Sequence, residues 1–580
     1  MKVTKLLAAT ALALTPLLPA AAHAGEPAPN LTTGVMSRGI PALLDGEQRD
    51  GYRAVFKSIH DRNWTDAQLQ LAQMKPGPLH SVAEAELYIA KGSPKVDDAA
   101  LLAVLTAAPE LPEAPAIARI LTTRGVAVPT LPTQQRLIWR NGASVRTRAK
   151  ATKLDLAAAD LTLKMQPYIK GDMGPEAQAL LEATPNLTPD AQTEWQQRIA
   201  WIYFLQGDNA NARSMAAKAR VGSGDWAVQG DWVGALAAWR QHDCAAAGAG
   251  FVDVAARASD VELRAAGLYW ASRADMQCGH PERVEARLKN AAQLDETFYG
   301  MLARQQLGIQ DRPRGGDELM LADWDKLSNR PNVRVAAALV EIGETDLADD
   351  VLRQQAKIGP ATEYSSLVRL TESLDLPETL MWLGNNCPQG TTPPTIARFP
   401  APKWAPDGGW RVDKALIYAH ALQESRFRRN VISPAGAYGV MQIVPAAATD
   451  YARERGITID RGALAQPSVN MAVGQRTLER LSTQSFSGGL LPKVIAAYNA
   501  GPLPVTEWNT IVRDGGDPLL WIESIPYWET RGYVTTVLRN YWMYEKKDGR
   551  TTSASRAALA QGMWPKFPGL PGPSAVRLIK

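Results

Sequence analysis

The stretch Gly207–Ala212, with the sequence GDNANA, contains the pattern that decides the predicted fold. A glycine ends one helix, a polar residue begins the next, and a small apolar residue follows five positions after the glycine. The same order recurs at Gly230–Ala235, Gly279–Val284 and Gly343–Ala348. Glycine supplies a left-handed helix cap, and the small residue lets paired helices approach closely. We therefore expect stacked helix pairs, an α-solenoid, with unrelated helical hairpins as the alternative.

Helical periodicity dominates from about residue 40 to about residue 390, and alternating β-branched stretches are nearly absent. A Pro/Gly-rich stretch at 386–411 then interrupts the pattern, because a helix cannot persist through it. We place the boundary to a C-terminal domain there. A second Pro/Gly-rich stretch begins at about Met563 and is expected to be irregular or to lie on the surface.

The N-terminus has the pattern of a secretory signal peptide. Two lysines precede an apolar run at 6–22, and Ala22–Ala24 supplies the small residues of a cleavage site. Pro16 and Pro19 interrupt the apolar run, and no later stretch approaches the roughly 18 apolar residues of a spanning helix. We therefore expect a soluble exported protein with no transmembrane segment, located in the periplasm.

The composition excludes some functions. A net charge of +4 over 580 residues is too weak to indicate a nucleic-acid partner. The 17 Trp and 15 Tyr against 8 Phe suit sugar stacking, although any single Trp is more readily explained as filling a helix-pair core. Of the three cysteines, Cys244 and Cys278 are the better pair for a disulfide, which leaves Cys387 free. No Cys/His spacing suggests a metal site.

A carboxylic acid lies at the end of an apolar helix stripe. A helix expected from about residue 412 to about residue 427 places Ile417, Ala421 and Glu424 on one face. Burial raises the pKa of a glutamic acid, and a protonated carboxyl is what general acid catalysis needs. The alternative is a surface glutamate paired with Arg426 or Arg428.

The run Ser433–Ile443 follows this helix and is rich in groups that suit a ligand. Gly436 and Gly439 allow the backbone to approach a ligand closely. Met441 offers an adaptable wall, and the Gln442 amide can donate and accept hydrogen bonds, as an N-acetyl sugar requires. Together with the preceding carboxyl group, this run indicates a sugar-binding site.

Two further blocks contribute candidate residues. The helix ending at Asn499 is followed by a glycine cap and a proline, which explain the end of the helix but not Tyr498 and Asn499. The Tyr498 hydroxyl is a candidate hydrogen-bond partner for the acid. In the aromatic block 521–544, Glu529 is either a helix N-terminal acid favoured by the dipole or a residue facing the cleft.

In order and spacing, these blocks resemble the soluble lytic murein transglycosylases, whose catalytic domain is similar to goose-type lysozyme. The matching segments are Glu424–Ser425, Ser433–Pro445, Asn470 with Gly474, Ala497–Pro502 and Ile525–Val534. Upstream, Leu268–Arg273 and Phe298–Ala303 resemble the large periplasmic branch, in which a long helical ring carries the catalytic domain.

The resemblance implies an all-α fold: a ring-like superhelix of helix pairs, a small helical linker domain and a lysozyme-like catalytic domain. The predicted division is a signal peptide at 1–24, an α-superhelical domain at 25–318, a linker domain at 319–395, a catalytic domain at 396–555 and a Pro/Gly-rich tail at 556–580.

The activity that the resemblance implies is cleavage of the β-1,4 bond between N-acetylmuramic acid and N-acetylglucosamine, with a 1,6-anhydro ring on the product. Glu424 would be the acid and then the base, assisted by the substrate acetamide, without metal or cofactor. Ser433 would hold the N-acetyl group. The remaining expected substrate-binding residues are Gly439, Met441, Gln442, Tyr498, Asn499, Glu529 and Tyr533, of which Tyr533 is the weaker candidate.

The chain departs from the family pattern at two positions, because Leu422 replaces an arginine and Thr477 a tyrosine. Neither change removes a proposed reacting group. Two alternatives stay open: a hydrolytic muramidase on the same scaffold, and a non-catalytic scaffold that holds glycan. The expected partners are peptidoglycan glycan strands, with cell-wall synthesis proteins as candidates for the helical domain.

Overall fold

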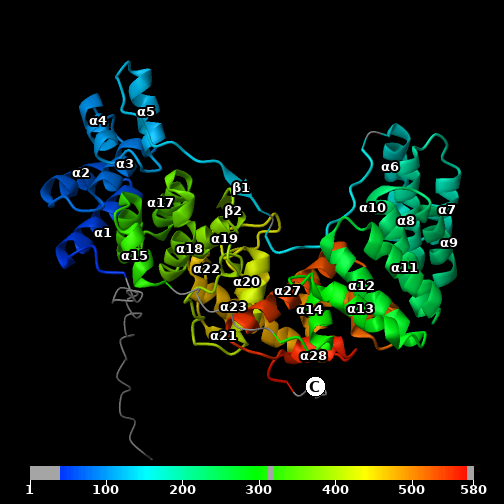
Figure 1. The fold of residues 1–580 in the computed structure, drawn as a ribbon. Coiled ribbons are helices and arrows are strands. Elements are labelled where there is room, and N and C mark those ends of the chain that lie inside the picture. The colour runs from blue at the N-terminus through cyan, green and yellow to red at the C-terminus, as the bar shows by residue number, and fades with distance from the viewer. Residues whose placement is uncertain (1–39, 141, 154, 311–318, 571–580) are drawn as a thin grey trace, which may run out of the picture.

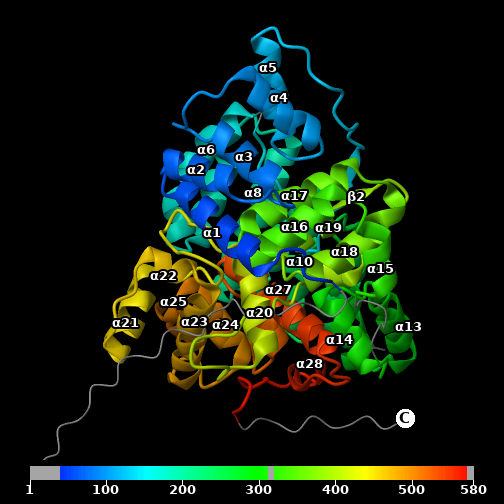
Figure 2. The same ribbon diagram turned by 90° about the vertical axis from the view of Figure 1, so that its left-hand side faces the viewer.

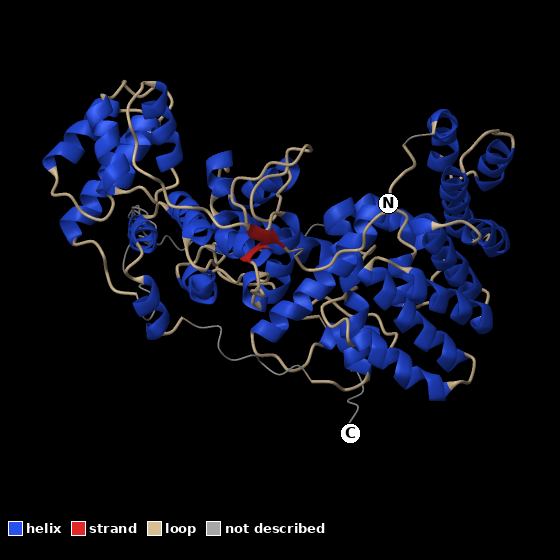
Figure 3. Ribbon diagram, turned by 45° about the horizontal axis from the view of Figure 1, so that its top comes forward, coloured by secondary structure: helices blue, strands red, loops and turns tan. Residues whose placement is uncertain are grey.

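The structure is a computed structural model that describes residues 40–140, 142–153, 155–310 and 319–570. The predicted signal peptide and the last ten residues of the predicted tail lie outside this part of the chain. Helices make up most of the described chain, and its only two strands have three residues each (Figure 3). The all-α class is therefore confirmed.

Helices from two distant parts of the sequence share the first hydrophobic core. Buried residues such as Phe56 and Leu105 belong to the same cluster as Leu339 and Leu352, and these helices group at the left in Figure 1. The first set is α1 (Gly46–His60), α2 (Trp64–Gln73), α3 (His80–Ile89), α4 (Asp98–Ala107) and α5 (Ala114–Thr123). The second set is α15 (Leu321–Leu327), α16 (Pro331–Ile342), α17 (Thr345–Ile358), η1 (Ala361–Glu363), α18 (Tyr364–Ser373), α19 (Pro377–Asn385) and η2 (Thr395–Ala397).

The helices between these two sets stack in sequence order. Each helix from α8 to α13 packs against its successor, as expected for an α-solenoid. The set is α6 (Leu156–Lys170), α7 (Gly174–Glu182), α8 (Pro189–Gln206), α9 (Asn209–Arg220), α10 (Gly224–Arg240), α11 (Cys244–Arg257), α12 (Val261–Gln277), α13 (Pro281–Ala292) and α14 (Phe298–Gln306). Polar N-caps begin many of them; the Asp208 and Asp260 side chains, for example, each accept from an amide of the first turn.

The glycine pattern predicts three of its four helix junctions correctly. Gly207 and Gly343 cap α8 and α16 in the left-handed conformation, and Gly279 has φ 75° between α12 and α13. Gly230 is the exception, because it lies in the middle of α10. A Cβ at Gly230 would lie 2.9 Å from the Ala219 Cβ, so this glycine serves the close contact between α9 and α10. Packing rather than capping explains it.

The predicted disulfide is present and joins neighbouring helices of the stack. Cys244 begins α11, and Cys278 follows the last residue of α12, with 5.6 Å between their Cα atoms. Cys387 is a buried free thiol on strand β2. The bridge closes the hairpin of these two helices.

The C-terminal region extends the core of the helix stack. Residues of α6–α14 and of α20–α28 form one hydrophobic cluster, and α14 packs against both α27 and α28. The helices of this region run from yellow to red in Figures 1 and 2, and the last of them lies at the lower edge of the molecule, close to α14. They are α20 (Lys414–Glu424), α21 (Pro445–Arg455), α22 (Arg461–Ala465), α23 (Pro467–Thr483), α24 (Leu491–Ala500), α25 (Pro502–Ile511), α26 (Pro518–Glu523), α27 (Trp528–Lys547) and α28 (Ala554–Ala560).

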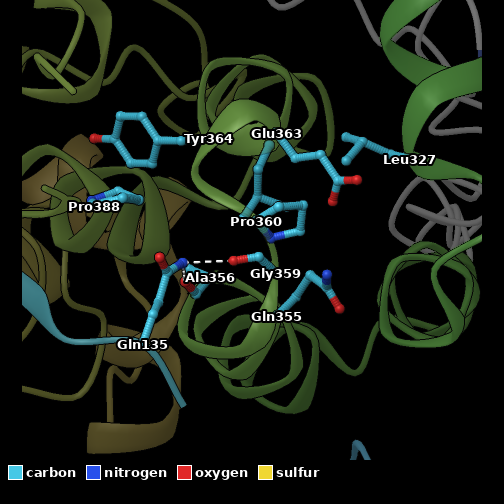
Figure 4. Close-up of a pocket in the computed structure, with 10 residues that line it drawn as sticks. Gln135, Leu327, Gln355, Ala356, Gly359, Pro360, Glu363, Tyr364 and Pro388 are labelled. Carbon is cyan, nitrogen blue, oxygen red and sulfur yellow. Dashed lines mark hydrogen bonds between the residues drawn. The ribbon is translucent and has the colours of Figure 1, made fainter. Parts of the chain in front are cut away.

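The described residues between α5 and α6 (124–140, 142–153 and 155) form an extended connector (Figure 1). Its strand β1 (Leu137–Trp139) pairs antiparallel with β2 (Asn386–Pro388). Just before β1, the Gln135 side-chain amide donates to the Gly359 carbonyl oxygen at 2.6 Å and to that of Ala356 at 3.0 Å, in a small pocket lined also by Tyr364 (Figure 4). The connector is thereby held against the helices that precede the C-terminal region.

The predicted domain division stays a prediction, although the packing adds detail to it. Helix α28 extends across the predicted start of the tail at residue 556. Among the described residues, no helix is both long enough and apolar enough to cross a membrane.

Candidate active site

Helix α20 is the central element of the candidate site. The side chain of its N-cap, Asp413, accepts from the Ala415 amide, and every residue from 415 to 422 is buried. A helix that is apolar on all sides lies inside a protein rather than on its surface. The sequence predicts only one apolar stripe, whereas the structure encloses the helix, with α27 as its main neighbour.

Glu424 is the last residue of this buried helix. The Tyr533 hydroxyl on α27 donates to its Oε1 at 2.6 Å. Burial raises the pKa of Glu424 to about 7; the Tyr533 hydrogen bond opposes this shift, and the nearby negative charge of Glu529 adds to it. The carboxyl group is therefore poised to exchange a proton near neutral pH.

The chain leaves α20 through an unusual turn. Arg426 and Phe427 have φ values of 56° and 62°, in the left-handed region that non-glycine residues rarely adopt. The Ser425 hydroxyl donates to the Val440 carbonyl oxygen at 2.7 Å and so joins the helix end to the following loop. Phe427 is fully buried, which holds the strained turn in place.

The loop 431–443 folds back on itself. Ile432 and Tyr438 form a bridge, as do Tyr438 and Ile443. The Ser433 hydroxyl accepts from the Ala437 amide at 3.0 Å. Its proton stays available for a ligand, but this side chain first serves the turn in which it lies.

Asn470, on α23, holds the loop from behind. Its side-chain carbonyl oxygen accepts from the Met441 amide at 2.8 Å, and its NH2 group donates to the carbonyl oxygens of Tyr438 and Leu464. All three bonds are made by a fully buried side chain. The loop backbone is therefore hydrogen-bonded directly to a helix.

Two tyrosines approach Glu424 from different helices. The sequence nominates Tyr498 as a hydrogen-bond partner of the acid, but its hydroxyl donates to the Met441 carbonyl oxygen at 2.9 Å. Tyr533, the weaker candidate, contacts the carboxyl group instead. Burial and the charge of Glu424 raise the pKa of both tyrosines well above the ordinary value, so both stay protonated.

The other candidates lie around the loop with varied surroundings. Gln442 has φ 49°, and its amide NH2 donates to the Val431 and Gly439 carbonyl oxygens, which leaves only its oxygen for a ligand. The Asn499 side chain accepts from the Thr530 hydroxyl at 2.6 Å and joins α24 to α27. Glu529 is exposed and affects Glu424 through charge.

The sequence reasoning missed one side chain of this cluster. His420 lies four residues before Glu424, on the same side of α20, and its Nδ1 is 2.8 Å from the Tyr533 hydroxyl. Its ring centroid lies 4.7 Å from that of Tyr498. The helical spacing of four residues was the available signal. In the described part of the chain, no group of three or more His, Cys, Asp or Glu side chains could hold a metal ion.

These features define a class of protein: a helical superhelix joined to a lysozyme-like domain that presents a half-buried carboxylic acid beside a glycine-containing loop. The family profile described as "Transglycosylase SLT domain" matches residues 405–519, which include α20, the loop and all of α21–α25.

Lytic transglycosylases are similar to this chain in sequence and in fold. The soluble lytic murein transglycosylase of Salmonella typhimurium is 37% identical over 132 residues, 22% of this chain and 20% of that protein. The alignment thus spans about a fifth of its length. The solved lytic transglycosylase Slt of Pseudomonas aeruginosa has a TM-score of 0.53 at 19% identity, over 87% of this chain and 86% of that one.

The 70 kDa soluble lytic transglycosylase of Escherichia coli has a TM-score of 0.53 at 18% identity, over 91% of this chain and all of that one. The predicted resemblance to the soluble lytic murein transglycosylases is confirmed, by sequence in the C-terminal region and by fold over most of the chain.

Proposed function

We propose that this chain is a lytic murein transglycosylase that cleaves the β-1,4 bond between N-acetylmuramic acid and N-acetylglucosamine and leaves a 1,6-anhydro ring. The observation that carries the proposal is the state of Glu424. Burial raises its pKa to about 7, and it lies at the end of α20, next to Ser425, which is hydrogen-bonded to the loop 431–443. A group that is partly protonated near neutral pH can act first as an acid and then as a base.

In the first step, Glu424 donates its proton to the glycosidic oxygen as the bond from that oxygen to C1 breaks. N-acetylglucosamine leaves with a new hydroxyl group. Most glycosidases use a second carboxylate here. Glu529 is the carboxylate whose charge reaches Glu424, and it is exposed. We propose that the acetamide oxygen of the substrate, rather than this second carboxylate, bonds to C1.

In the second step, the C6 hydroxyl oxygen attacks C1 and the bond from C1 to the acetamide oxygen breaks. Ionised Glu424 accepts the C6 hydroxyl proton and returns to its starting state. No water is consumed. Every proton and bond is then accounted for with one carboxyl group and no cofactor.

The loop and its neighbours are proposed to bind the substrate. The free oxygen of the Gln442 amide is available to accept from a sugar N–H or O–H, and Ser433 to donate to the N-acetyl group. Gly439, Met441 and the Asn499 region shape the wall, with Tyr498 fixing the loop backbone. Exposed Glu529 and buried Tyr533 complete the set around Glu424.

The test is digestion of purified sacculi, with mass spectrometry of the released muropeptides. The parent protein is expected to release anhydro ends, lighter than reducing ends by one water. Glu424→Gln is expected to lower the rate about a thousandfold, in the range of a lost general acid. Glu507→Gln, at an exposed position on α25, is the matched control and is expected to retain activity.

Other outcomes identify the alternatives. Reducing muramic ends from the parent would indicate a hydrolytic muramidase. Binding of sacculi without any release by the parent would indicate a glycan-binding scaffold. We also propose that the chain acts in the periplasm on glycan strands; binding of cell-wall synthesis proteins to the helical domain stays a prediction.

A further inference from the structure

His420 begins a chain of hydrogen bonds that ends at the proposed acid. Its side chain is fully buried. Its Nδ1 lies 2.8 Å from the Tyr533 hydroxyl, which in turn lies 2.6 Å from Glu424 Oε1. His420 and Glu424 belong to α20, whereas Tyr533 belongs to α27. The hydrogen bonds therefore connect two residues one turn apart on α20 through a side chain of α27.

The number of protons on each group sets which atom donates in these two hydrogen bonds. A hydroxyl group has one proton to donate. When Tyr533 donates it to Glu424, its oxygen can only accept from His420, and Nδ1 must then carry a hydrogen. Burial lowers the pKa of His420 to about 3, so the ring is neutral and has only this one N–H. Its Nε2 has no hydrogen-bond partner among the described residues, as suits a bare lone pair in a dry site.

The opposite direction is less favourable. If Tyr533 donated to His420, no described group would donate to Glu424 Oε1, and the ionised form of the acid would lose its hydrogen bond. The other carboxyl oxygen, Oε2, has no hydrogen bond to any described residue. With Oε1 held as an acceptor, the transferable proton belongs on Oε2.

We propose that His420 is a positioning residue that, through its Nδ1–H, holds the Tyr533 hydroxyl toward Glu424 Oε1 and so keeps the transferable proton on Oε2. The proposal rests on the proposed role of Glu424 as acid and base. His420 does not touch the reacting atoms. It acts through Tyr533 and keeps one carboxyl oxygen for delivering and recovering the proton during the two steps.

The groups that influence Glu424 come from three helices, and all of them bear on the test. They are His420 from α20, Tyr498 from α24, and Glu529 and Tyr533 from α27. Because the Tyr533 hydrogen bond favours the ionised carboxylate, loosening it moves the titration of Glu424 upward. A merely structural role for His420 would leave that titration unchanged.

The experiment compares three substitutions at His420 in the full chain. His420→Leu keeps the volume but removes the donor, and we expect kcat about tenfold lower, KM within about twofold, and the basic limb of the pH–rate profile about half a unit higher. His420→Asn places an amide N–H on Cγ, where Nδ1 is, and is expected to restore most of kcat. His420→Gln carries its amide one bond further out and is expected to resemble the leucine variant.

A double-mutant cycle with Tyr533→Phe tests whether His420 acts through Tyr533. In the Tyr533→Phe background, His420→Leu is expected to cause no further loss of kcat. Additive losses, an unshifted pH profile in both the Leu and Gln variants, or a Gln variant as active as the Asn variant would each overturn the proposal. If the leucine variant does not fold, by circular dichroism and thermal melting, the Asn and Gln pair gives the answer.

Failure of the His420 proposal can be distinguished from failure of the proposed function. Full activity of Glu424→Gln would reject both. Reducing ends released by the parent would reject the anhydro product, but the His420 series would still test how the acid is held.

Discussion

At the scale of single residues, Glu424 is governed by two opposing influences. Burial is the larger and favours the neutral acid, while the Tyr533 hydrogen bond favours the carboxylate. The charge of Glu529 acts in the same direction as burial. The balance places the pKa at about 7, where both forms that the proposed mechanism needs are populated.

These influences predict opposite effects of two substitutions on the pH profile. The parent kcat/KM is expected to fall as pH rises above about 7, because Glu424 must begin protonated. Tyr533→Phe removes the bond that lowers the pKa, so the limb should move upward. Glu529→Gln removes the charge that raises it, so the limb should move downward. Shifts in the same direction in both variants, measured on soluble glycan strands, would contradict this assignment.

The raised pKa also predicts how stability depends on pH. Folded Glu424 has a pKa of about 7 and an unfolded glutamic acid about 4.5, so the folded state holds this proton more tightly. The stabilisation is fully present below about pH 4.5 and is lost as pH rises through 7, a change of up to about 3 kcal/mol. In Glu424→Gln the free energy of unfolding does not fall in this way, because the amide does not ionise.

The measurement is the difference in Tm between Glu424→Gln and the parent. It should grow in favour of the variant between pH 4.5 and pH 8. Glu507→Gln, on the surface, controls for a general effect of removing a charge. A difference that is the same at both pH values would show that the carboxyl group is not buried as described.

At the scale of elements, the site depends on how α20, the loop 431–443 and α23 fit together. Asn470 holds the loop with two hydrogen bonds and contacts α22 with a third. The small size of Gly474 makes room for the Met441 side chain, because a Cβ there would lie 2.7 Å from Met441 Cε. The sequence order of these segments was informative because each carries its own turn and cap residues. Their mutual fit depends on side chains from different helices.

Two glycines in the loop allow a matched test. Gly436 and Gly439 have nearly equal φ values of 78° and 79°. A Cβ on Gly439 would overlap the Asn470 amide and lie 2.8 Å from the Leu464 carbonyl oxygen, whereas nothing lies within 4 Å of one on Gly436. Gly436→Ala should therefore lower the free energy of unfolding only by the backbone strain, about 1 kcal/mol. Gly439→Ala should lower it by about 2–4 kcal/mol and remove most of the activity.

Thermal melting and sacculus digestion of the two variants measure this difference. Equal losses of Tm would mean that backbone conformation alone matters at both positions. That result would contradict the hydrogen-bonded fit of the loop against Asn470.

At the scale of the whole molecule, the helix stack and the C-terminal region form one continuous core with buried ion pairs across it. Glu523, at the end of α26, has no exposed surface and accepts from Arg146 of the connector at 2.5 Å and from Tyr299 of α14 at 2.8 Å. Arg539 of α27 pairs in the same way with Glu262 of α12 at 3.3 Å. The connector and the stack are thereby joined to the helices that carry the site.

Breaking one of these pairs is expected to loosen the joint. Arg146→Met or Glu523→Gln leaves a buried charge or polar group unpaired, which costs about 3–5 kcal/mol. The double substitution removes both charges and should recover much of the loss in Tm. Glu182→Gln, in the exposed pair with Lys218, should change Tm little.

The rate of limited proteolysis in the connector should be highest in the two single variants, lower in the double variant and unchanged in Glu182→Gln. If the double variant is no more stable than either single variant, the pair is not the interaction that joins these parts.

The sequence by itself determined the helical class, most of the capping glycines and the segments that carry the site, because caps, periodicity and turn residues act over a few neighbouring positions. It could not determine that Gly230 lies inside a helix, or that Tyr533 rather than Tyr498 is hydrogen-bonded to Glu424. Nor could it determine that His420 contacts the Tyr533 hydroxyl.

Those outcomes were decided only by the tertiary structure. Each depends on how closely two helices from different parts of the chain approach, and hydrophobic packing of the whole core sets that distance. The same burial that places the three side chains together also raises the pKa of Glu424 and keeps His420 neutral. The chemistry of the site thus follows from packing that no single stretch of the sequence contains.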